Sequence, residues 1–240
     1  MPGVGSLDSL LEVQEIDTKL DQLRHRHETL PERDAVAAAE AAKLQAEATV
    51  EATFAQLHEV RSAQKHAEDE AASVEEKAKE VDRTLYGGTI KAAKELEAYQ
   101  ADLAMLKQRQ ESLEEEALEK MEQAEPLESQ LAARRDAAAA AEDAVADARA
   151  ALAAAEAELD AEIAAVESGR TAVVDPLPQE VLAQYEALRR GLAGVGAAKL
   201  VGSRCEGCHL EIPSAELEAV RRAPEDAVVN CPECGRILIR

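Results

Sequence analysis

Leu85-Tyr86-Gly87-Gly88-Thr89 separates two long stretches that contain no other glycine, residues 6–85 before it and residues 89–168 after it. Each stretch holds one proline, Pro31 in the first and Pro126 in the second. Glycine reaches the backbone angles of a tight reversal without a steric penalty, and it often follows the last turn of a helix. The sequence therefore predicts two helices of similar length joined by a turn near residues 86–89.

Apolar residues on both sides of this turn repeat every seven positions, with a companion track three residues further on. Spacing of three and four residues forms the seam of a left-handed coiled coil. After the turn the seam comprises Leu96, Leu103, Gln110, Ala117, Ala124, Leu131, Ala138, Val145, Leu152, Leu159 and Val166, with Tyr99, Leu106, Leu113, Lys120, Leu127, Arg134, Ala141, Ala148, Ala155 and Glu162 on the companion track. Lys120 and Arg134 dilute its middle part.

The stretch before the turn carries the same signal in two blocks of different phase. The first block is Val13, Ile16, Leu20, Leu23, His27 and Leu30, and the second is Val50, Leu57, Gln64, Ala71, Ala78 and Leu85 with Val60, Ala67, Val74 and Val81. The phase changes near Pro31. A proline removes one helical hydrogen bond and bends the helix, so we expect a break there and a bend at Pro126.

Two such seams can bury each other within one chain or between subunits. The equal lengths and the glycine break favour an antiparallel hairpin within one chain. With a reversal at Gly87-Gly88, we expect Leu20 to lie near Ala154 and Val60 near Glu114. The predicted fold class is thus mainly α, with a long coiled-coil hairpin.

The hairpin is expected to occupy residues 1–170, and a connector with a short amphipathic helix to follow over residues 171–198. Asp175-Pro176-Leu177-Pro178 stops one helix and allows another to start. The apolar stripe of the new helix, which ends near Arg190, comprises Leu177, Val181, Tyr185 and Leu188. The glycine-rich residues 191–196 are typical of a turn, since they lack the Gly-Lys-Ser/Thr ending of a phosphate-binding loop.

Two cysteine pairs close the sequence, Cys205-x-x-Cys208 and Cys231-x-x-Cys234, with 22 residues between them. Two short turns can each present two sulfurs to one tetrahedral ion, so this spacing predicts a four-thiolate zinc site. Short β-prone runs flank the pairs at Lys199–Val201 and Ile237–Ile239. We therefore expect residues 199–240 to form a zinc ribbon that holds one structural Zn²⁺.

Other chemistry for these cysteines is less well supported. Cys205-Glu206-Gly207-Cys208-His209 matches the CxxCH pattern of haem attachment, but haem or redox work leaves the other pair without a role. A catalytic zinc keeps an open coordination position, whereas four cysteines close the shell. Gly235 is expected to adopt the left-handed conformation that turns backbone N–H groups toward a cysteine sulfur and stabilises the thiolate.

The chain of 240 residues has a net charge of −22 that is unevenly distributed. Residues 199–240 contain six Lys or Arg and seven Asp or Glu, a net charge of −1, which leaves −21 for residues 1–198. The hairpin should therefore repel nucleic-acid phosphates unless a local basic patch intervenes.

The sequence also indicates where the protein is located and whether it is an enzyme. There is no apolar run long enough for a membrane span and no basic start with an apolar segment, so we expect no membrane partner and a cytoplasmic location. Cysteines in that reducing compartment are metal ligands more often than disulfides. No hydrolase elbow, Walker loop or HExxH motif is present, which predicts no enzyme activity and no small-molecule substrate.

The chain resembles the bacterial C4-type zinc-ribbon proteins that carry a long N-terminal coiled-coil hairpin. The resemblance lies in Leu200–His209, Val229–Leu238, the turn Leu85–Thr89 and the following Lys94–Ala98. It implies a zinc-bound ribbon beside a coiled-coil hairpin, protein and nucleic-acid partners, no enzyme activity, and an adaptor role in transcription or RNA handling.

We therefore predict a non-enzymatic adaptor or scaffold that binds protein partners, with binding of RNA or DNA through the zinc ribbon as the alternative. Recognition is expected mainly at the ribbon and the adjoining helix, and secondarily at the turn around Tyr86 and Lys91. The candidate contacts for a partner or nucleic acid are the arginines of that region, Arg189, Arg190, Arg204, Arg221, Arg222, Arg236 and Arg240.

Overall fold

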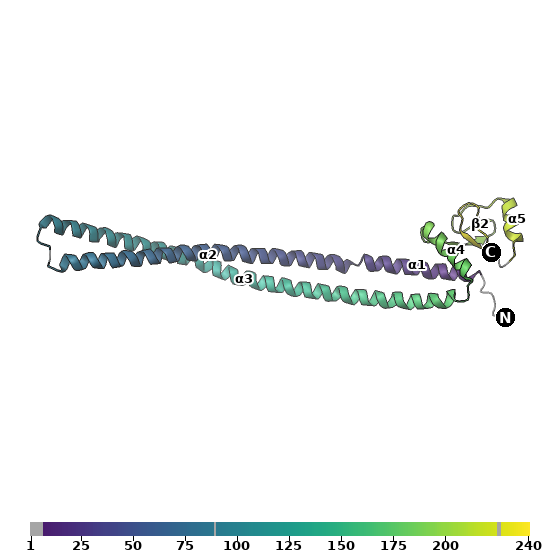
Figure 1. Ribbon diagram of the computed structural model, residues 1–240, viewed down its shortest axis with the longest axis horizontal. Helices are drawn as coiled ribbons and strands as arrows, with labels where there is room; N and C mark the ends of the chain where they lie inside the picture. The colour runs from purple at the N-terminus through teal and green to yellow at the C-terminus, as the bar shows by residue number, and fades with distance from the viewer. Residues whose placement is uncertain (1–6, 89, 225–226) are drawn as a thin grey trace. The chain divides into compact units, whose positions relative to one another are not determined.

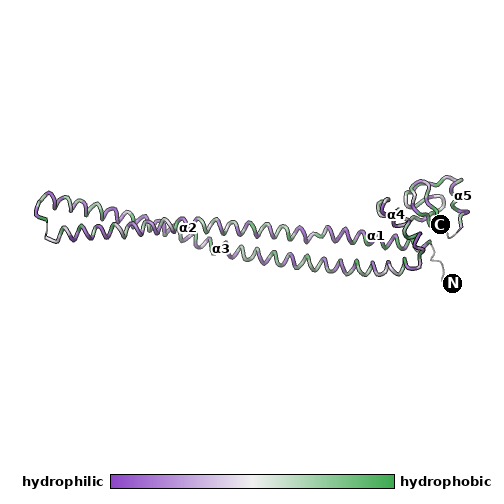
Figure 2. The backbone as a smooth tube through the Cα atoms, viewed as in Figure 1, coloured by the Kyte–Doolittle hydropathy of each residue, from purple (hydrophilic) through white to green (hydrophobic). Residues whose placement is uncertain are grey.

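The computed structural model describes residues 7–88, 90–224 and 227–240, and its fold is mainly helical. The elements are α1 (Ser9–Glu28), α2 (Pro31–Tyr86), α3 (Ala93–Val174), α4 (Gln179–Gly191), β1 (Ala197–Val201), β2 (Arg204–Cys205), α5 (Ser214–Arg222) and β3 (Ile237–Ile239) (Figure 1). Figure 2 shows hydrophilic and hydrophobic residues interleaved along α2 and α3, as helices with a narrow apolar seam require. The predicted coiled-coil hairpin and C-terminal ribbon are confirmed.

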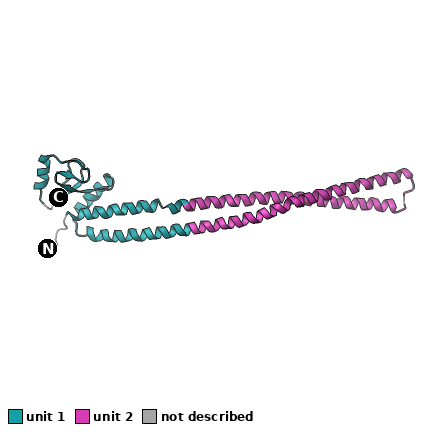
Figure 3. Ribbon diagram, turned by 180° about the vertical axis from the view of Figure 1, so that it is seen from behind, with its two compact units in different colours: residues 1–34, 149–240 teal, residues 35–148 magenta. Residues whose placement is uncertain are grey.

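The chain divides into two compact units (Figure 3). Unit 1 comprises residues 1–34 and 149–240, and unit 2 comprises residues 35–148. The units are defined by contacts in space and not by continuous sequence, so each contains parts of both α2 and α3. The sequence-based boundaries at residues 170 and 198 stay a prediction.

In unit 2 the chain reverses direction between α2 and α3, so the two helices run antiparallel (Figure 1). Gly88 has a φ of +73°, the left-handed conformation expected at a tight turn. A Cβ on Gly87 would lie 2.8 Å from the carbonyl oxygen of Arg83, so a side chain there would collide with the last turn of α2. The glycine pair is therefore required where the sequence predicted it, and Thr89 lies outside the described residues.

The predicted seam of α3 is buried or half-buried at every position but the first. Ala124 and Leu113 are its most enclosed residues in unit 2, at 1% and 2% exposure. Leu96 is 39% exposed and does not belong to the seam, so its prediction is wrong. The cluster nearest the turn is formed by Ala78, Leu85 and Leu103 with Val81, Ile90, Tyr99 and Leu106.

The register of the pairing in unit 2 also differs from the sequence expectation. Arg61 forms an ion pair with Glu128, whereas Val60 was expected near Glu114. The prediction is therefore wrong by about four helical turns.

The physical reason is the length of chain between the last packed turn of α2 and the first packed turn of α3. The reversal continues past Gly87-Gly88, because α3 begins only at Ala93. Residues 93–98 are helical but exposed, and Tyr99 is the first residue of α3 to be half-buried. Each helix therefore pairs with residues further along its partner than a two-glycine turn would allow.

A polar layer interrupts the seam where the sequence predicted dilution by Arg134. Thr53 is fully buried, and its Oγ1 accepts a hydrogen bond from Nη1 of Arg134. The same nitrogen donates to the carbonyl oxygen of Thr49 at 3.1 Å. A buried polar contact across a coiled coil specifies the register, because a slipped pairing leaves both groups unsatisfied.

Replacing Thr53 with valine should lower the free energy of unfolding by about 1 kcal/mol, because Arg134 loses its side-chain acceptor while the side-chain shape is kept. The measurement is urea unfolding followed by circular dichroism at 222 nm. Thr49→Val is the matched control, since the Thr49 hydroxyl is exposed and donates to the carbonyl oxygen of Ala46 in its own helix. Equal midpoints for the two variants would show that the polar layer contributes nothing.

Unit 1 contains the break predicted near Pro31, because α1 ends at Glu28 and α2 starts at Pro31. Lys19 pairs with Glu162 at 3.4 Å, so the expected position of Leu20 near Ala154 is wrong as well.

The predicted amphipathic helix of the connector is confirmed as α4. Its Tyr185 is fully buried in a core shared by α1, the α3–α4 segment, α4 and the sheet, with Leu10, Val13, Leu177, Ala197, Ile237 and Ile239.

The ribbon contains a small sheet with the strand order β2-β1-β3. β1 pairs antiparallel with β2 and parallel with β3. One face of the sheet belongs to the core around Tyr185, and Ala198 and Leu238 belong to a second cluster that includes Cys205 and Cys231. The sheet therefore joins the cysteine site to the helices of unit 1.

Candidate metal centre

The four cysteines of the two pairs converge on one point. Their Sγ atoms all lie within 4.8 Å of one another. The Sγ atoms of Cys205 and Cys234 are 4.0 Å apart, and those of Cys208 and Cys231 are 3.9 Å apart. A tetrahedral ion with Zn–S bonds of ~2.3 Å requires sulfurs about 3.8 Å apart, whereas a disulfide requires ~2.05 Å. The donor set therefore fits one zinc ion.

Each cysteine pair is closed by the same backbone turn. The N–H of His209 donates to the carbonyl oxygen of Cys205 at 2.7 Å, and the N–H of Gly235 donates to that of Cys231 at 2.8 Å. Both donors have a positive φ, 60° at His209 and 76° at Gly235. The left-handed conformation predicted for Gly235 is confirmed, and His209 holds it without the freedom of a glycine.

Burial and hydrogen bonds act in opposite directions on the thiols. Burial raises the pKa of the Cys205 thiol, and it raises that of Cys231 to about 12, although backbone N–H groups of each turn oppose it. Burial also acts on Cys234, but hydrogen bonds from the backbone N–H and the guanidinium of Arg236, together with those from the Cys208 and Cys231 thiols, outweigh it and lower the pKa to about 7. The turns thus supply the donors that stabilise thiolate sulfur in such a site.

Comparison with known protein families matches almost the whole chain to two family models. Residues 13–192 match the CT398-like coiled coil hairpin domain, which is most of the sequence. The chain belongs to the CT398-like coiled-coil hairpin family. Residues 204–238 match the C4-type zinc ribbon domain, and this range contains all four cysteines.

Relatives and solved structures match nearly the whole length of this chain. The uncharacterized protein Rv2229c of Mycobacterium tuberculosis is 35% identical over 238 residues, covering 99% of this chain and 96% of the relative. A solved structure from Mycobacterium smegmatis has a TM-score of 0.82 at 31% identity and covers 99% of both chains. The 2.12 Å structure of CT398 from Chlamydia trachomatis, at 19% identity, has a TM-score of 0.69, covers 97% of this chain and 96% of that one, and supports the same fold.

The C4 ribbon and the geometry of its four sulfurs agree on one structural Zn²⁺. Cys205, Cys208, Cys231 and Cys234 would hold it, and the bound ion supplies a crosslink between the two turns of the ribbon. Four protein ligands fill a tetrahedral shell, which is the arrangement of structural zinc sites.

The two left-handed residues allow a paired prediction for the ribbon. His209→Gly should slow zinc release, because glycine relieves a conformation that costs an L-residue about 1 kcal/mol. Gly235→Ala should accelerate zinc release, because alanine strains the backbone at this position by a free energy of similar size. Nothing lies within 4 Å of the added Cβ, so the strain comes from the backbone alone. Zinc transfer to a colorimetric chelator measures both. Changes in the same direction would contradict this account.

A buried polar cluster next to the ribbon was missed by the sequence analysis. Asp17 of α1 is 3% exposed, and its carboxylate accepts hydrogen bonds from Nε of Arg170 at 2.7 Å and from the hydroxyl of Tyr185 at 2.8 Å. Arg189 of α4 donates to the carbonyl oxygen of Asp17 at 3.2 Å. Burial, followed by the bond to Asp17, raises the pKa of the Tyr185 phenol. The cluster therefore ties α1, α3 and α4 together.

Gln14, one turn before Asp17, holds the segment that leads into β1. Its side-chain Nε2 donates to the carbonyl oxygen of Gly194 at 2.8 Å, and its Oε1 accepts from the N–H of Gly196 at 2.7 Å. A Cβ on Gly196 would lie 2.6 Å from the carbonyl oxygen of Tyr185, so only glycine fits this passage. The glycine-rich segment is thus a tightly held turn.

The seven candidate arginines lie in different settings. Arg189 belongs to the cluster around Asp17, and Arg236 donates to the carbonyl oxygens of Val195 and Leu192. Arg240 donates to the carbonyl oxygens at the C-terminal end of α5, those of Val220, Ala223 and Pro224. Arg190, Arg204, Arg221 and Arg222 are exposed. Arg221 donates to the carbonyl oxygen of Gly202, and Arg222 pairs with Glu218. Four of the seven, Arg189, Arg221, Arg236 and Arg240, therefore donate to backbone carbonyl oxygens within unit 1.

Proposed function

We propose that the protein is a non-enzymatic adaptor that binds protein partners through its zinc ribbon, with the coiled-coil hairpin as the scaffold. One observation carries the proposal: the ribbon exposes Val201 and Leu210 at 53% and 51%. Val201 pairs with Arg204, and Arg204 forms a bridge with Glu211, so the two apolar side chains belong to neighbouring segments of one small sheet. Apolar side chains beside an arginine are typical of protein interfaces.

The way the ribbon is held supports this role. Gln14 fixes the segment entering β1, and Asp17 fixes α4 to α1 and α3. A recognition surface that is already ordered loses less conformational entropy when a partner binds. Neither matching family model is that of an enzyme, and a closed four-cysteine site suits a structural ion. For this adaptor we propose a cytoplasmic location and, as the family resemblance implies, a role in transcription or RNA handling.

The test is affinity capture with the tagged full-length chain from cells of its own species. The double variant Val201→Ser and Leu210→Ser should lose the partners that the unchanged chain recovers, while its zinc content stays the same. Leu44→Ser in unit 2, where Leu44 is 68% exposed, is the matched control. Recovery of the same partners by all three chains would contradict the proposal. Truncation after Gly169 is less suitable, because it would uncover Leu10 and Val13.

The exposed arginines keep nucleic acid as a second candidate partner. Arg204 and Arg222 are 51% and 78% exposed at their side chains. Binding of RNA or DNA through them should weaken steeply with salt, because bound counterions are released. Arg221→Ala with Arg222→Ala should abolish it at low salt, and no binding by the unchanged chain at low salt would remove this candidate for the ribbon.

A further inference from the structure

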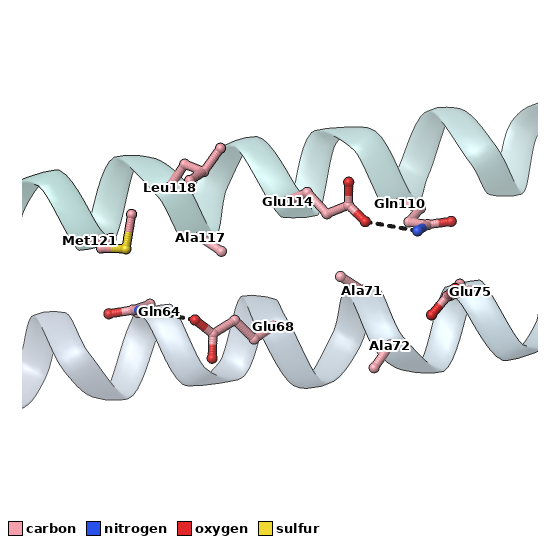
Figure 4. Close-up of a pocket in the computed structure, with 10 residues that line it drawn as sticks. All are labelled: Gln64, Glu68, Ala71, Ala72, Glu75, Gln110, Glu114, Ala117, Leu118 and Met121. Atoms are coloured by element: carbon pink, nitrogen blue, oxygen red, sulfur yellow. Dashed lines mark hydrogen bonds between the residues drawn. The ribbon is translucent and has the colours of Figure 1, made fainter.

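A groove of about 450 Å³ runs between α2 and α3 in unit 2, well separated in sequence from the ribbon (Figure 4). Its apolar lining includes Ala71 and Ala117, together with Leu118 and Met121 from α3. Leu118 is 56% exposed and Met121 is 40% exposed. Small alanine side chains on both helices leave room for another backbone to approach, and Leu118 and Met121 offer it apolar contact.

Two carboxylates on opposite walls of this groove are held in place by neutral amides. Nε2 of Gln64 donates to Glu68 at 2.7 Å on α2, and Nε2 of Gln110 donates to Glu114 at 2.8 Å on α3 (Figure 4). A glutamine amide orients a carboxylate four residues away but leaves its charge uncompensated. Among the described residues, neither Glu68 nor Glu114 forms an ion pair. The third carboxylate of the lining, Glu75, pairs with Lys79 at 2.9 Å, so the groove presents two oriented and uncompensated negative charges beside its apolar residues.

Two other grooves of the same hairpin have Lys or Arg side chains in their linings. The groove that includes Phe54 has Arg135 beside Glu47 and Glu51, and the groove nearer the turn has three cations, Lys79, Arg83 and Lys107, beside Glu75 and Asp82. The lining of the groove between Leu118 and Ala71 contains no Lys or Arg. Of these three grooves, this one therefore has acidic lining residues without any cation among them.

We propose that this groove binds a basic amphipathic helix of a protein partner. The apolar face of that helix would pack on Leu118, Met121 and the alanines, and its Lys or Arg side chains would reach Glu68 and Glu114. This is the helix-in-groove mode of peptide recognition, in which apolar anchors supply affinity and rim charges supply specificity. A second copy of this chain is a poorer occupant, because its hairpin carries the same net negative charge.

The surface lies outside the ribbon and goes beyond the proposed function, so the two can fail separately. The probe is a fluorescein-labelled helical peptide of 18 residues with leucine on one face and lysine on the other, and its neutral counterpart has glutamine in place of lysine. The full-length chain should bind the lysine peptide with an affinity that falls as salt is added, and it should bind the neutral peptide at least tenfold more weakly. A chain whose ribbon is disrupted by Cys231→Ser should bind the lysine peptide unchanged.

Matched variants decide whether the groove is the site. Glu68→Gln with Glu114→Gln should weaken binding of the lysine peptide about tenfold, as loss of two charge pairs implies. Glu115→Gln with Glu116→Gln changes the net charge equally on exposed residues outside the groove and should have little effect. Leu118→Gln should weaken binding at least fivefold, and Leu44→Gln should not.

Three results would overturn the proposal. The first is equal weakening by both glutamate pairs, which would indicate general attraction to an acidic chain. The second is no binding of the lysine peptide, or equal binding of the neutral one. The third is a dimer in sedimentation that Leu118→Gln dissociates, which would assign the groove to a second copy. Unchanged circular dichroism of each variant excludes loss of the helices as the cause.

Discussion

Replacing Cys231 with serine is expected to unfold the zinc ribbon while leaving the helices of unit 2 intact. Cys231 is 2% exposed and belongs to the cluster that contains Ala198, Ile212 and Leu238, so its loss removes both a ligand and a core contact. Metal binding by a small zinc domain contributes most of its folding free energy, on the order of 10 kcal/mol. The hydrophobic cluster that contains Ala198 and Leu238 is small, so we expect it to unfold without the ion.

The expected result is one zinc per unchanged chain and none per Cys231→Ser chain by elemental analysis. Amide exchange of residues 199–240 should then become fast, whereas residues 35–148 keep their protection. Removing zinc with a chelator should reproduce this pattern, and returning zinc should reverse it. Zinc bound at full stoichiometry by the variant, or an unchanged exchange rate in the ribbon, would contradict the assignment of Cys231 as a structural ligand.

The elements of this fold were accessible from the sequence because each has a local signature. Seven-residue spacing gave the seam, and Ala117, Ala124 and Leu131 are buried at the predicted positions. Two CxxC pairs gave the metal site, since four sulfurs at this spacing have few other uses. The break at Pro31 and the turn at Gly87-Gly88 follow from the backbone limits of proline and glycine.

The register and the buried polar contacts depend on non-local packing and were not predicted. The heptad repeat is the same in every register, so it does not specify whether Arg61 faces Glu128 or a residue four turns away. Asp17 did leave a signal. Leu10, Val13, Asp17 and Leu20 are spaced by three, four and three residues, which places a carboxylate in the apolar seam of α1. The predicted seam contained the neighbouring Ile16 instead, which is only half-buried.

The arginines illustrate a different limit. Sequence shows that Arg236 and Arg240 are cationic and near the cysteines, but it does not show that their N–H groups meet backbone carbonyl oxygens. The local sequence does not distinguish an arginine that donates to carbonyl oxygens of its own chain from one that is free to bind a phosphate. Only the three-dimensional positions of Leu192, Val195 and Val220 separate these roles.

Asp17→Asn is expected to loosen the attachment of α4 to α1 and α3 more than any other single polar substitution in the described part of unit 1. The carboxylate is the shared acceptor of Arg170 and Tyr185, at 2.7 Å and 2.8 Å, and it lies 3.7 Å from Nε of Arg189. Asparagine keeps the shape but leaves two arginines, only 22% and 20% exposed at their side chains, without the buried countercharge. Breaking such a pair costs about 3 kcal/mol.

Hydrogen exchange over α1 and α4 is the suitable measurement, because a chain with two units need not unfold in one transition. Protection of α4 should fall by roughly two orders of magnitude in Asp17→Asn, which is the exchange equivalent of about 3 kcal/mol. Asp21→Asn is the matched control: Asp21 also pairs with Arg189, but its side chain is 48% exposed, so the loss should stay below about 1 kcal/mol. If both variants lose protection equally, the burial of Asp17 carries no special weight, and α4 is held by its contacts with Leu10 and Val13 instead.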